Sequence, residues 1–494
     1  MTTWDYSHLV ARQGNRSSQA NRATQRGPMA SRLRRLLLPT IGIGLTCALG
    51  ASAWFLAPVL SVGVGHKARV LCSGVFVSKR TPAAVLADLQ VDDLSVLTYV
   101  NSSIDIAAHT VTARALGVER RAVYREGLGC ALELGNLTQP GLLESHRNPR
   151  VATESSDSTE VTPAEWSVAG HRNAQLDAVV ARAFEEPDAR YPRRTRAVVV
   201  MQGGRIIAEH YGTGIGSDTA LAGWSMSKSV MNALVGVLVQ EGRLTVDAPA
   251  PIPEWHQPGD PRARITVDQL LRMTSGLRFD EKQDSPRSDV MRMLFGVGDI
   301  ARFVTSRDAA FAPGTHWEYS NACSNIISVA IRNVLRDHST YLAFPKRALF
   351  DPLGMSSAVL ETDAAGTFIG SSYLYATARD WARFGMLYLR DGVWNGARLL
   401  PPGWVDYTRT PAPADEAKRY GAHFWLEIPA EYAGSNPWLP APALHAAGHE
   451  GQFVTIVPSR DLVIVRLGRT RYPHAWDHAA FVRDVLASVH RATQ

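Results

Sequence analysis

The tetrapeptide Ser225-Met226-Ser227-Lys228 carries more information than any other part of this 494-residue chain. On a helix, residues three apart share a face, so the Lys228 amine can reach the Ser225 hydroxyl. A lysine whose pKa is lowered by burial or by a nearby cation can deprotonate that hydroxyl and make it a nucleophile. The chain has six lysines, and only Lys228 has a serine three residues before it. The pattern is short enough to occur by chance, so the surrounding sequence has to support it.

The residues after this tetrapeptide predict a buried helix. Residues 229–240 are almost wholly apolar, and Gly242 just beyond them is a common helix stop. The run is too short to cross a membrane comfortably. Ser225 is therefore expected at the N-terminal end of a buried helix, where backbone N–H groups and the helix dipole favour a developing negative charge.

Two later motifs bring further polar residues. Tyr319 and Asn321, in Trp317-Glu318-Tyr319-Ser320-Asn321, can face one pocket from a loop, although a turn with a packed aromatic gives the same pattern. Gly448-His449-Glu450-Gly451-Gln452 comes before an apolar run over 453–458 that predicts a strand. Its glycines allow a ligand to approach the backbone closely. Taken alone, the motif Gly448-His449-Glu450-Gly451-Gln452 indicates only a turn at the edge of a strand.

In this order, the three motifs resemble those of serine hydrolases of the β-lactamase/penicillin-recognising superfamily. The chain looks most similar to class C β-lactamases, their esterase relatives and the aminohexanoate-dimer hydrolases. The sequence segments 270–277, 350–355 and 377–385 also look like those of the family, and the resemblance covers roughly residues 170–490. It implies an α+β fold, in which an antiparallel sheet is flanked by N- and C-terminal helices and carries a helical insert domain. It is specific for the superfamily and much less so for a substrate.

The resemblance also implies a role for the residues of the first two motifs. Ser225 would be the acylated nucleophile, and Lys228 its general base or the partner of that base. Tyr319 would move protons between the nucleophile and the leaving group, and Asn321 would orient the substrate. No metal and no cofactor is expected, and the implied substrate is a small ester, amide or lactam.

The third motif departs from the family pattern. His449 and Gly451 occupy the place of the family's Lys-Thr-Gly motif, and the backbone N–H groups of Ser225 and Gln452 would form the oxyanion hole. Lysine is replaced by His449, and threonine by Glu450. A histidine that is neutral near pH 7 is poorer than lysine at binding a β-lactam carboxylate. The departure therefore favours esters or small amides over β-lactams.

The basic residues of the chain are concentrated at its start. Residues 1–35 contain seven arginines and one acid, Asp5, which accounts for the whole formal net charge of +6. The remainder is formally neutral, so no nucleic-acid partner is expected for the folded part. Residues 1–35 are interpreted as a solvated, arginine-rich cytoplasmic tail.

A long apolar segment follows the tail. Residues 36–65 contain no charged side chain, and this segment is long enough for a tilted transmembrane helix. The arginines before it predict a single-pass anchor in the inner membrane, with the catalytic part in the periplasm or outside the cell. A signal peptide cleaved at Ala51-Ser52-Ala53 is the competing interpretation. We favour the anchor because the apolar run continues past Ala53.

The cysteines agree with export. A Cys72–Cys130 disulfide fits an oxidising compartment, with two buried thiols as the alternative. No C-x-x-C pair occurs, so the sequence gives no support for a zinc site. His445 and His449 are better explained as loop and site residues than as metal ligands.

The remaining organisation follows from composition and periodicity. Residues 67–137 are expected to form a small mixed module with short strands at 75–77 and 122–124, acting as a spacer, a partner-binding unit or a lid. Residues 138–165 read as a linker, and 166–494 as the hydrolase domain. Within that domain the sequence predicts terminal helices near 174–183 and 476–490, and strands near 196–201, 206–211, 452–457 and 462–467.

Three functions from different classes remain open at this point. The first is an active serine hydrolase that turns over through an acyl-enzyme, which the intact Ser225, Lys228 and Tyr319 favour. The second is a β-lactamase or penicillin-binding protein with slow turnover, against which His449 counts. The third is an inactive, membrane-tethered scaffold that keeps the hydrolase fold.

Overall fold

The computed structural model describes residues 56–91, 97–134 and 173–489. The predicted tail, most of the predicted anchor and the predicted linker lie outside these residues, as does the predicted start of the hydrolase domain at Trp166. Within the described ranges, no helix combines the length and the apolar character that crossing a membrane requires.

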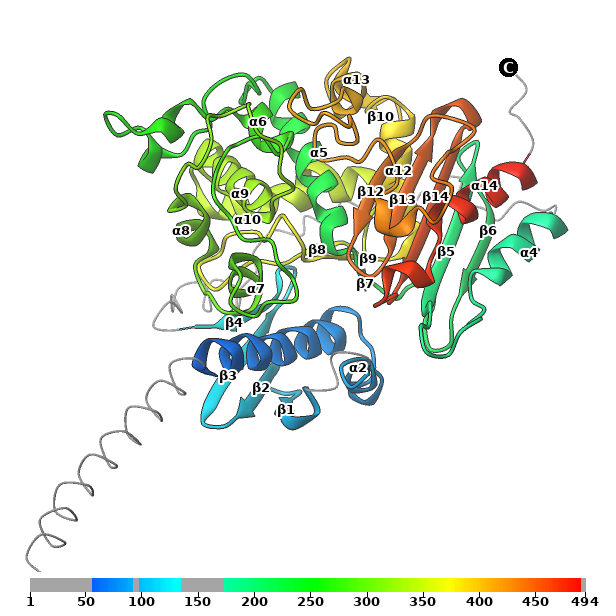
Figure 1. Ribbon diagram of the computed structural model, residues 1–494, viewed down its shortest axis with the longest axis horizontal. Coiled ribbons are helices and arrows are strands. Elements are labelled where there is room, and N and C mark those ends of the chain that lie inside the picture. Colours follow the sequence, from blue (N-terminus) through cyan, green and yellow to red (C-terminus); the bar gives the residue numbers. More distant parts are fainter. Residues whose placement is uncertain (1–55, 92–96, 135–172, 490–494) are drawn as a thin grey trace, which may run out of the picture. The chain divides into compact units, whose positions relative to one another are not determined.

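A five-stranded antiparallel sheet is the framework of the hydrolase domain (Figure 1). The strand order is β12-β13-β14-β5-β6, so the strands that open the domain pair with those that close it. Val463 of β14 lies opposite Met201 of β5, for example. The four predicted strands are confirmed, and the sheet comprises β5 (Thr195–Gln202), β6 (Arg205–Tyr211), β12 (Leu444–Gly448), β13 (Gln452–Val457) and β14 (Leu462–Gly468).

Side chains alternate between the two faces of this sheet, which therefore carries a hydrophobic core on each side. Val463 and Val465 of β14 belong to one core, and Leu462 and Ile464 to the other. Helix α12 (Ala378–Leu389) covers the first face. The predicted terminal helices cover the second, as α4 (Ala174–Arg182) and α14 (His478–Ser488).

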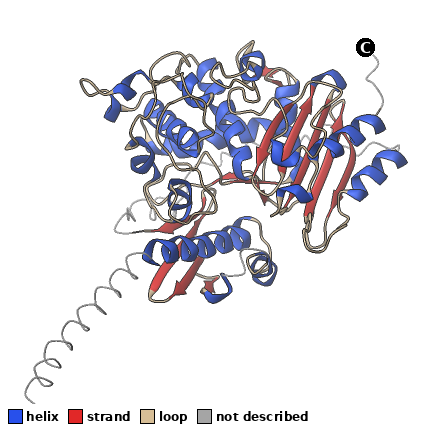
Figure 2. Cartoon of the chain, viewed as in Figure 1, coloured by secondary structure: helices blue, strands red, loops and turns tan. Residues whose placement is uncertain are grey.

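The predicted helical insert is also confirmed (Figure 2). Its centre is α5 (Ser227–Gln240), which is buried over most of its length and packs against α9 (Asn321–Leu335). Other elements complete the domain: α6 (Val267–Leu271), α7 (Asp289–Phe295), α8 (Ile300–Thr305), α10 (His338–Pro345), α11 (Asp351–Leu353), α13 (Trp404–Arg409), a small sheet of β7 (Leu221–Ala222), β8 (Val359–Leu360) and β9 (Leu374–Ala376), and the pair β10 (Val393–Trp394) and β11 (Ala397–Arg398).

The region before the hydrolase domain folds as a mixed module, defined here as residues 57–134. A helix over 56–72 continues into the π-helical turn η1 (Ser73–Val77), and α2 (Pro82–Asp88) follows. Cys72 and Cys130 form a disulfide with 6.1 Å between their Cα atoms. The sheet of the module has four antiparallel strands in sequential order: β1 (Asn101–Asp105), β2 (Thr110–Ala115), β3 (Val118–Arg125) and β4 (Gly129–Glu133).

Two expectations for this region are wrong. The strand predicted at 75–77 is helical, because three apolar residues are too few to separate a strand from a helical turn by periodicity. The boundary between anchor and module, predicted at 65–67, falls inside the continuous helix over 56–72. Val62 and Val64 of this helix are buried in the folded protein, so residues 57–65 belong to the module.

Candidate active site

Ser225 lies in the short turn η5 (Trp224–Met226) that leads into α5. Trp224 has a φ of 47°, a conformation that a bulky residue adopts only when its surroundings enforce it. Lys228 is in the first turn of α5, with 1 % of its surface exposed. Its Nζ lies 3.1 Å from Ser225 Oγ, as the three-residue spacing predicts.

The other contacts of Lys228 determine where its lone pair can point. Nζ also donates to Asn321 Oδ1 at 2.8 Å and to the Ser371 carbonyl at 3.0 Å. Both of these atoms can only accept hydrogen bonds. A neutral amine therefore uses its two N–H groups on them and turns its lone pair to Ser225. Burial lowers the pKa of Lys228 well below its usual range, and the charge of Glu281 opposes this shift.

Glu281 is a site residue that the sequence motifs did not reveal. Its two carboxyl oxygens accept the backbone N–H and the side-chain Nδ2 of Asn321, each at 2.5 Å. The amide of Asn321 is thereby oriented with its oxygen towards Lys228. Burial raises the pKa of Glu281, and the hydrogen bonds from Asn321 oppose the rise. Glu281 comes shortly after the family-like segment 270–277, but no sequence pattern links it to Asn321, which is 40 positions away.

Tyr319 completes the surroundings of the nucleophile. Its hydroxyl hydrogen-bonds with the Ser225 side chain, and its ring centroid is 4.9 Å from Lys228 Nζ. The ring stacks on Trp425 at 5.5 Å, which fixes its orientation. Burial raises the pKa of Tyr319, so the hydroxyl keeps its proton near neutral pH. Tyr319 is on a loop as expected, whereas Asn321 is the first residue of α9.

The third motif forms a tight hairpin whose base packs against Ser225. Gly448 ends β12 and pairs with Gln452, which begins β13. A Cβ on Gly448 would lie 2.2 Å from the Gly223 carbonyl oxygen and 3.2 Å from the Ser225 backbone nitrogen. Only glycine fits there, and it brings the next residue, His449, close to the serine turn.

The side chains of this hairpin differ in what they face. Gln452 is buried, and its Nε2 donates to the carbonyls of His449 at 2.9 Å and Gly468 at 2.7 Å. Gly451 packs against Arg466. His449 instead lines the cavity over Ser225, with its ring 5.7 Å from that of Trp224.

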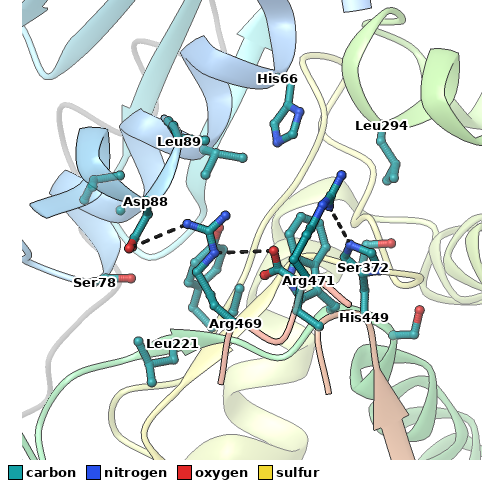
Figure 3. A pocket seen from close by; sticks show the side chains of 18 of the residues that line it. His66, Ser78, Asp88, Leu89, Leu221, Leu294, Ser372, His449, Arg469 and Arg471 are labelled. Carbon is teal, nitrogen blue, oxygen red and sulfur yellow. Dashed lines mark hydrogen bonds and ion pairs between the residues drawn. The ribbon is translucent and has the colours of Figure 1, made fainter. Parts of the chain in front are cut away.

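Ser225 is among the residues that line a cavity of about 190 Å³. Figure 3 shows part of this lining, including His449. Of the predicted site residues, Ser225, Asn321 and His449 line it directly. Lys228 and Tyr319 contact Ser225 without belonging to the lining. The rest of the wall comes from both the hydrolase domain and the N-terminal module. The arrangement provides a serine hydroxyl with an adjacent amine and phenol at the bottom of a partly apolar cavity.

This chain belongs to the beta-lactamase family, whose profile matches residues 180–487. It is a serine hydrolase of that family. One curated relative is the 6-aminohexanoate-dimer hydrolase of Paenarthrobacter ureafaciens, with 26% identity over 67% of this chain and 85% of the relative.

Solved structures show the same fold at lower sequence identity. A candidate beta-lactamase from Bacteroides dorei is 19% identical, with a TM-score of 0.51 over 64% of this chain and 98% of that one. A family VIII carboxylesterase is 15% identical, with a TM-score of 0.50 over 65% of this chain and 99% of that one. The family profile, which gives the matched residues as 180–487, lies within the hydrolase domain.

Proposed function

We propose that this chain cleaves small esters or amides through an acyl-enzyme on Ser225. One observation carries the proposal. Lys228 Nζ donates two hydrogen bonds, to Asn321 Oδ1 and to the Ser371 carbonyl, and Ser225 Oγ lies 3.1 Å from the same nitrogen. In this geometry Lys228 acts as a base towards Ser225 and towards no other group. Ester and amide substrates are consistent with the hydrolase and esterase relatives.

The proposed reaction has two halves. Ser225 Oγ attacks the substrate carbonyl while Lys228 takes its proton. As the tetrahedral intermediate collapses, the Tyr319 hydroxyl passes its proton to the leaving group, and the proton that Lys228 took from Ser225 is returned to the Tyr319 oxygen, so that Lys228 is neutral and Tyr319 protonated again. Water then attacks the acyl-enzyme with the same groups in reversed roles, and Ser225 is released.

The oxyanion of the intermediate needs two N–H donors. The sequence indicated the backbone N–H groups of Ser225 and Gln452. The packing favours His449 in place of Gln452, because Gly448 lies against the Ser225 nitrogen and His449 is the hairpin residue that enters the cavity. We therefore propose Ser225 and His449 as the two donors, with the Gln452 side chain holding the hairpin that presents His449.

A kinetic comparison tests this function. The full chain is assayed with a short-chain p-nitrophenyl ester and the matching p-nitroanilide, as wild type, Ser225→Ala and Ser227→Ala. Ser227 is the matched control, because its hydroxyl is used on the Trp224 carbonyl at 2.7 Å and the Leu374 N–H at 3.1 Å. We expect Ser225→Ala to lower kcat/KM by about a thousandfold or more. An equal loss of kcat/KM in Ser225→Ala and Ser227→Ala, or no loss in either variant, would refute the assignment of Ser225 as the nucleophile.

We also propose that residues 36–55 anchor the chain in the inner membrane, with the catalytic domain on the outer side. These twenty residues carry no charge and match the roughly 20 that a spanning helix needs. The Cys72–Cys130 disulfide supports an oxidising compartment. Carbonate extraction should leave the full chain in the membrane fraction, and protease added outside spheroplasts should digest the hydrolase domain. Release by carbonate, or full protection from protease, would contradict the proposal.

A further inference from the structure

The N-terminal module contributes part of the lining of the cavity that contains Ser225. The first helix of the module contributes His66 and Val70, and α2 contributes Val85 and Leu89. The family profile matches residues 180–487 and therefore begins after the module. What these side chains add to the site has to be inferred from their own contacts and chemistry.

Buried polar contacts hold the module against the hydrolase domain. Glu361 has no exposed surface and accepts hydrogen bonds from Arg69 at 3.1 Å, Ser73 Oγ at 2.7 Å and the Cys130 N–H at 2.8 Å. Cys130 also forms the disulfide with Cys72, which joins β4 to the end of the helix that lines the cavity. Because a buried ion pair is costly to separate, the part of the cavity wall that the module forms is held in place.

The position of α2 within the module is fixed as well. The Thr81 side chain accepts a hydrogen bond from the Ala84 N–H and so caps the start of this helix. Gly74 lies so close to α2 that a Cβ on it would be 2.6 Å from Val85 Cγ1. Val85 and Leu89 are four residues apart and share a face, and both are almost completely buried. Together they form a rigid apolar edge of the cavity.

The charged side chains in the lining have partners within the chain. The pairs are Asp88 with Arg80 and with Arg196, both at 2.6 Å, Glu450 with Arg469 at 3.3 Å, and His449 Nε2 with Arg471 Nη1 at 3.1 Å. Because these groups are engaged inside the protein, contact with an uncharged part of a substrate falls to the apolar side chains.

The hydrolase domain adds further apolar side chains to the lining. They come from β7 and α7: Leu221, Val290, Leu294 and Phe295. Figure 3 shows Leu89 of α2 and Leu294 of α7 on either side of His66. Each methylene of an aliphatic chain that is buried between such side chains is expected to raise kcat/KM by about fourfold. A rigid wall ends this gain, because a longer chain no longer fits.

We infer that Leu89 and Val85 of the module set the length of the aliphatic acyl group that Ser225 accepts. The inference rests on the proposed function, whose substrate class it narrows to esters or amides of an aliphatic carboxylic acid. Ser225 and α2 line the same cavity, so an acyl chain on Ser225 Oγ that fills the cavity ends against α2. The module thus has a role in selectivity, which the sequence did not predict.

A series of p-nitrophenyl esters from acetate to decanoate tests the inference on the full chain, with each ester kept below its micelle-forming concentration. We expect wild-type kcat/KM to rise with chain length to an optimum and then to fall. Leu89→Ala lengthens the cavity and should raise the ratio of kcat/KM for octanoate to that for butyrate by about tenfold or more. Val85→Ala should move this ratio in the same direction, and Leu89→Phe, whose ring shortens the cavity, should lower it by about tenfold.

Leu132→Ala is the matched control, because Leu132 is equally buried in the core of the module but is not part of the cavity lining. A loss of stability lowers the rates for all esters together, whereas a change in selectivity moves the ratio in opposite directions in Leu89→Ala and Leu89→Phe. A wild-type rate without an optimum, a ratio that the α2 variants leave unchanged, or an equal shift in Leu132→Ala would overturn the inference while the proposed function stands. If Ser225→Ala cleaves the esters as fast as the wild type, the proposed function fails and the inference fails with it.

Discussion

Lys228 is the residue whose charge state controls the proposed chemistry. Burial lowers its pKa, so the neutral amine that accepts the Ser225 proton becomes accessible below the usual lysine pKa of about 10.4. Because activity needs the neutral form, kcat/KM of the wild type should rise with pH through the lowered pKa. The acid limb of this profile, followed with a neutral ester, is expected well below pH ~10.

Lys228→Arg tests the base directly. Arginine keeps a positive charge near Ser225 but supplies no neutral form in the accessible pH range. We expect kcat/KM to fall by about a thousandfold or more, with the thermal midpoint measured in parallel to check folding. An active Lys228→Arg protein with an unchanged pH profile would mean that another group takes the serine proton.

Glu281 is expected to act through its neighbours rather than on the substrate. In Glu281→Gln one of the two acceptors of the Asn321 N–H groups becomes a donor, so the Asn321 amide loses its fixed orientation. The negative charge of Glu281 raises the pKa of Lys228, so its removal should move the acid limb of kcat/KM to lower pH while kcat decreases. Asp280→Asn, at the exposed neighbouring acid, is the control. A limb that stays in place, or moves equally in both variants, would argue against this role.

At this scale the sequence predicted Ser225, Lys228, Tyr319 and Asn321 because each lies in a short motif with a fixed spacing. Glu281 and Arg471 are in no such motif. Glu281 contacts Asn321 only because the loop before α7 folds back over the start of α9. Arg471 lies beyond the end of β14, and only the hairpin geometry brings it to His449.

Among the elements, the β12–β13 hairpin depends on the absence of a side chain at Gly448. A Cβ there would meet the Gly223 carbonyl oxygen at 2.2 Å, and a backbone atom cannot rotate away. Gly448→Ala should push the hairpin from Ser225, lower kcat/KM by about a hundredfold and destabilise the fold by about 1–3 kcal/mol.

Gly63→Ala is the control for Gly448→Ala. Among the residues that the structure describes, its new Cβ would meet only Leu97 Cδ2 at 3.8 Å, an ordinary contact. Urea unfolding and ester kinetics on both variants check the prediction. A Gly448→Ala protein with normal activity would show that the hairpin position is not needed for the reaction.

Sequence periodicity predicted the elements of the hydrolase domain better than those of the module. The strands at the two ends of the domain have alternating faces and turn residues between them, and the structure contains them. Apolar residues 75–77 suggested a strand, but they continue a helix that packs onto β4. Local pattern could not decide this, because burial against a sheet favours apolar residues in either conformation.

Across the whole molecule, the module and the hydrolase domain meet at Glu361. Glu361→Ala would leave Arg69 buried without its partner, a change that typically costs about 3–5 kcal/mol. We expect a lower denaturation midpoint, faster proteolysis between module and domain, and reduced ester hydrolysis, since the module forms a wall of the cavity.

Glu241→Ala is the comparison, because Glu241 pairs with Arg243 at 3.4 Å on the surface, where such pairs contribute about 0–1 kcal/mol. Equal stability of the two variants would show that the module does not depend on the Glu361 contacts.

The place of the module in the active site could not be predicted from the sequence. Its contacts join residues nearly 300 positions apart, such as Ser73 and Glu361, and no local pattern records such a pairing. The cysteine spacing suggested the Cys72–Cys130 disulfide that the structure contains. Its contribution to the wall of the cavity that contains Ser225 became visible only in three dimensions.

The central claim is that Ser225 carries the acyl group. The most direct test is to quench the reaction of the full chain with a short-chain p-nitrophenyl ester in acid during turnover, and to measure intact and peptide masses. The account predicts the mass of one acyl group on the peptide that contains Ser225, present in the wild type and Ser227→Ala and absent in Ser225→Ala. Ester turnover without an acylated protein, or an acyl group that persists in Ser225→Ala, would contradict it.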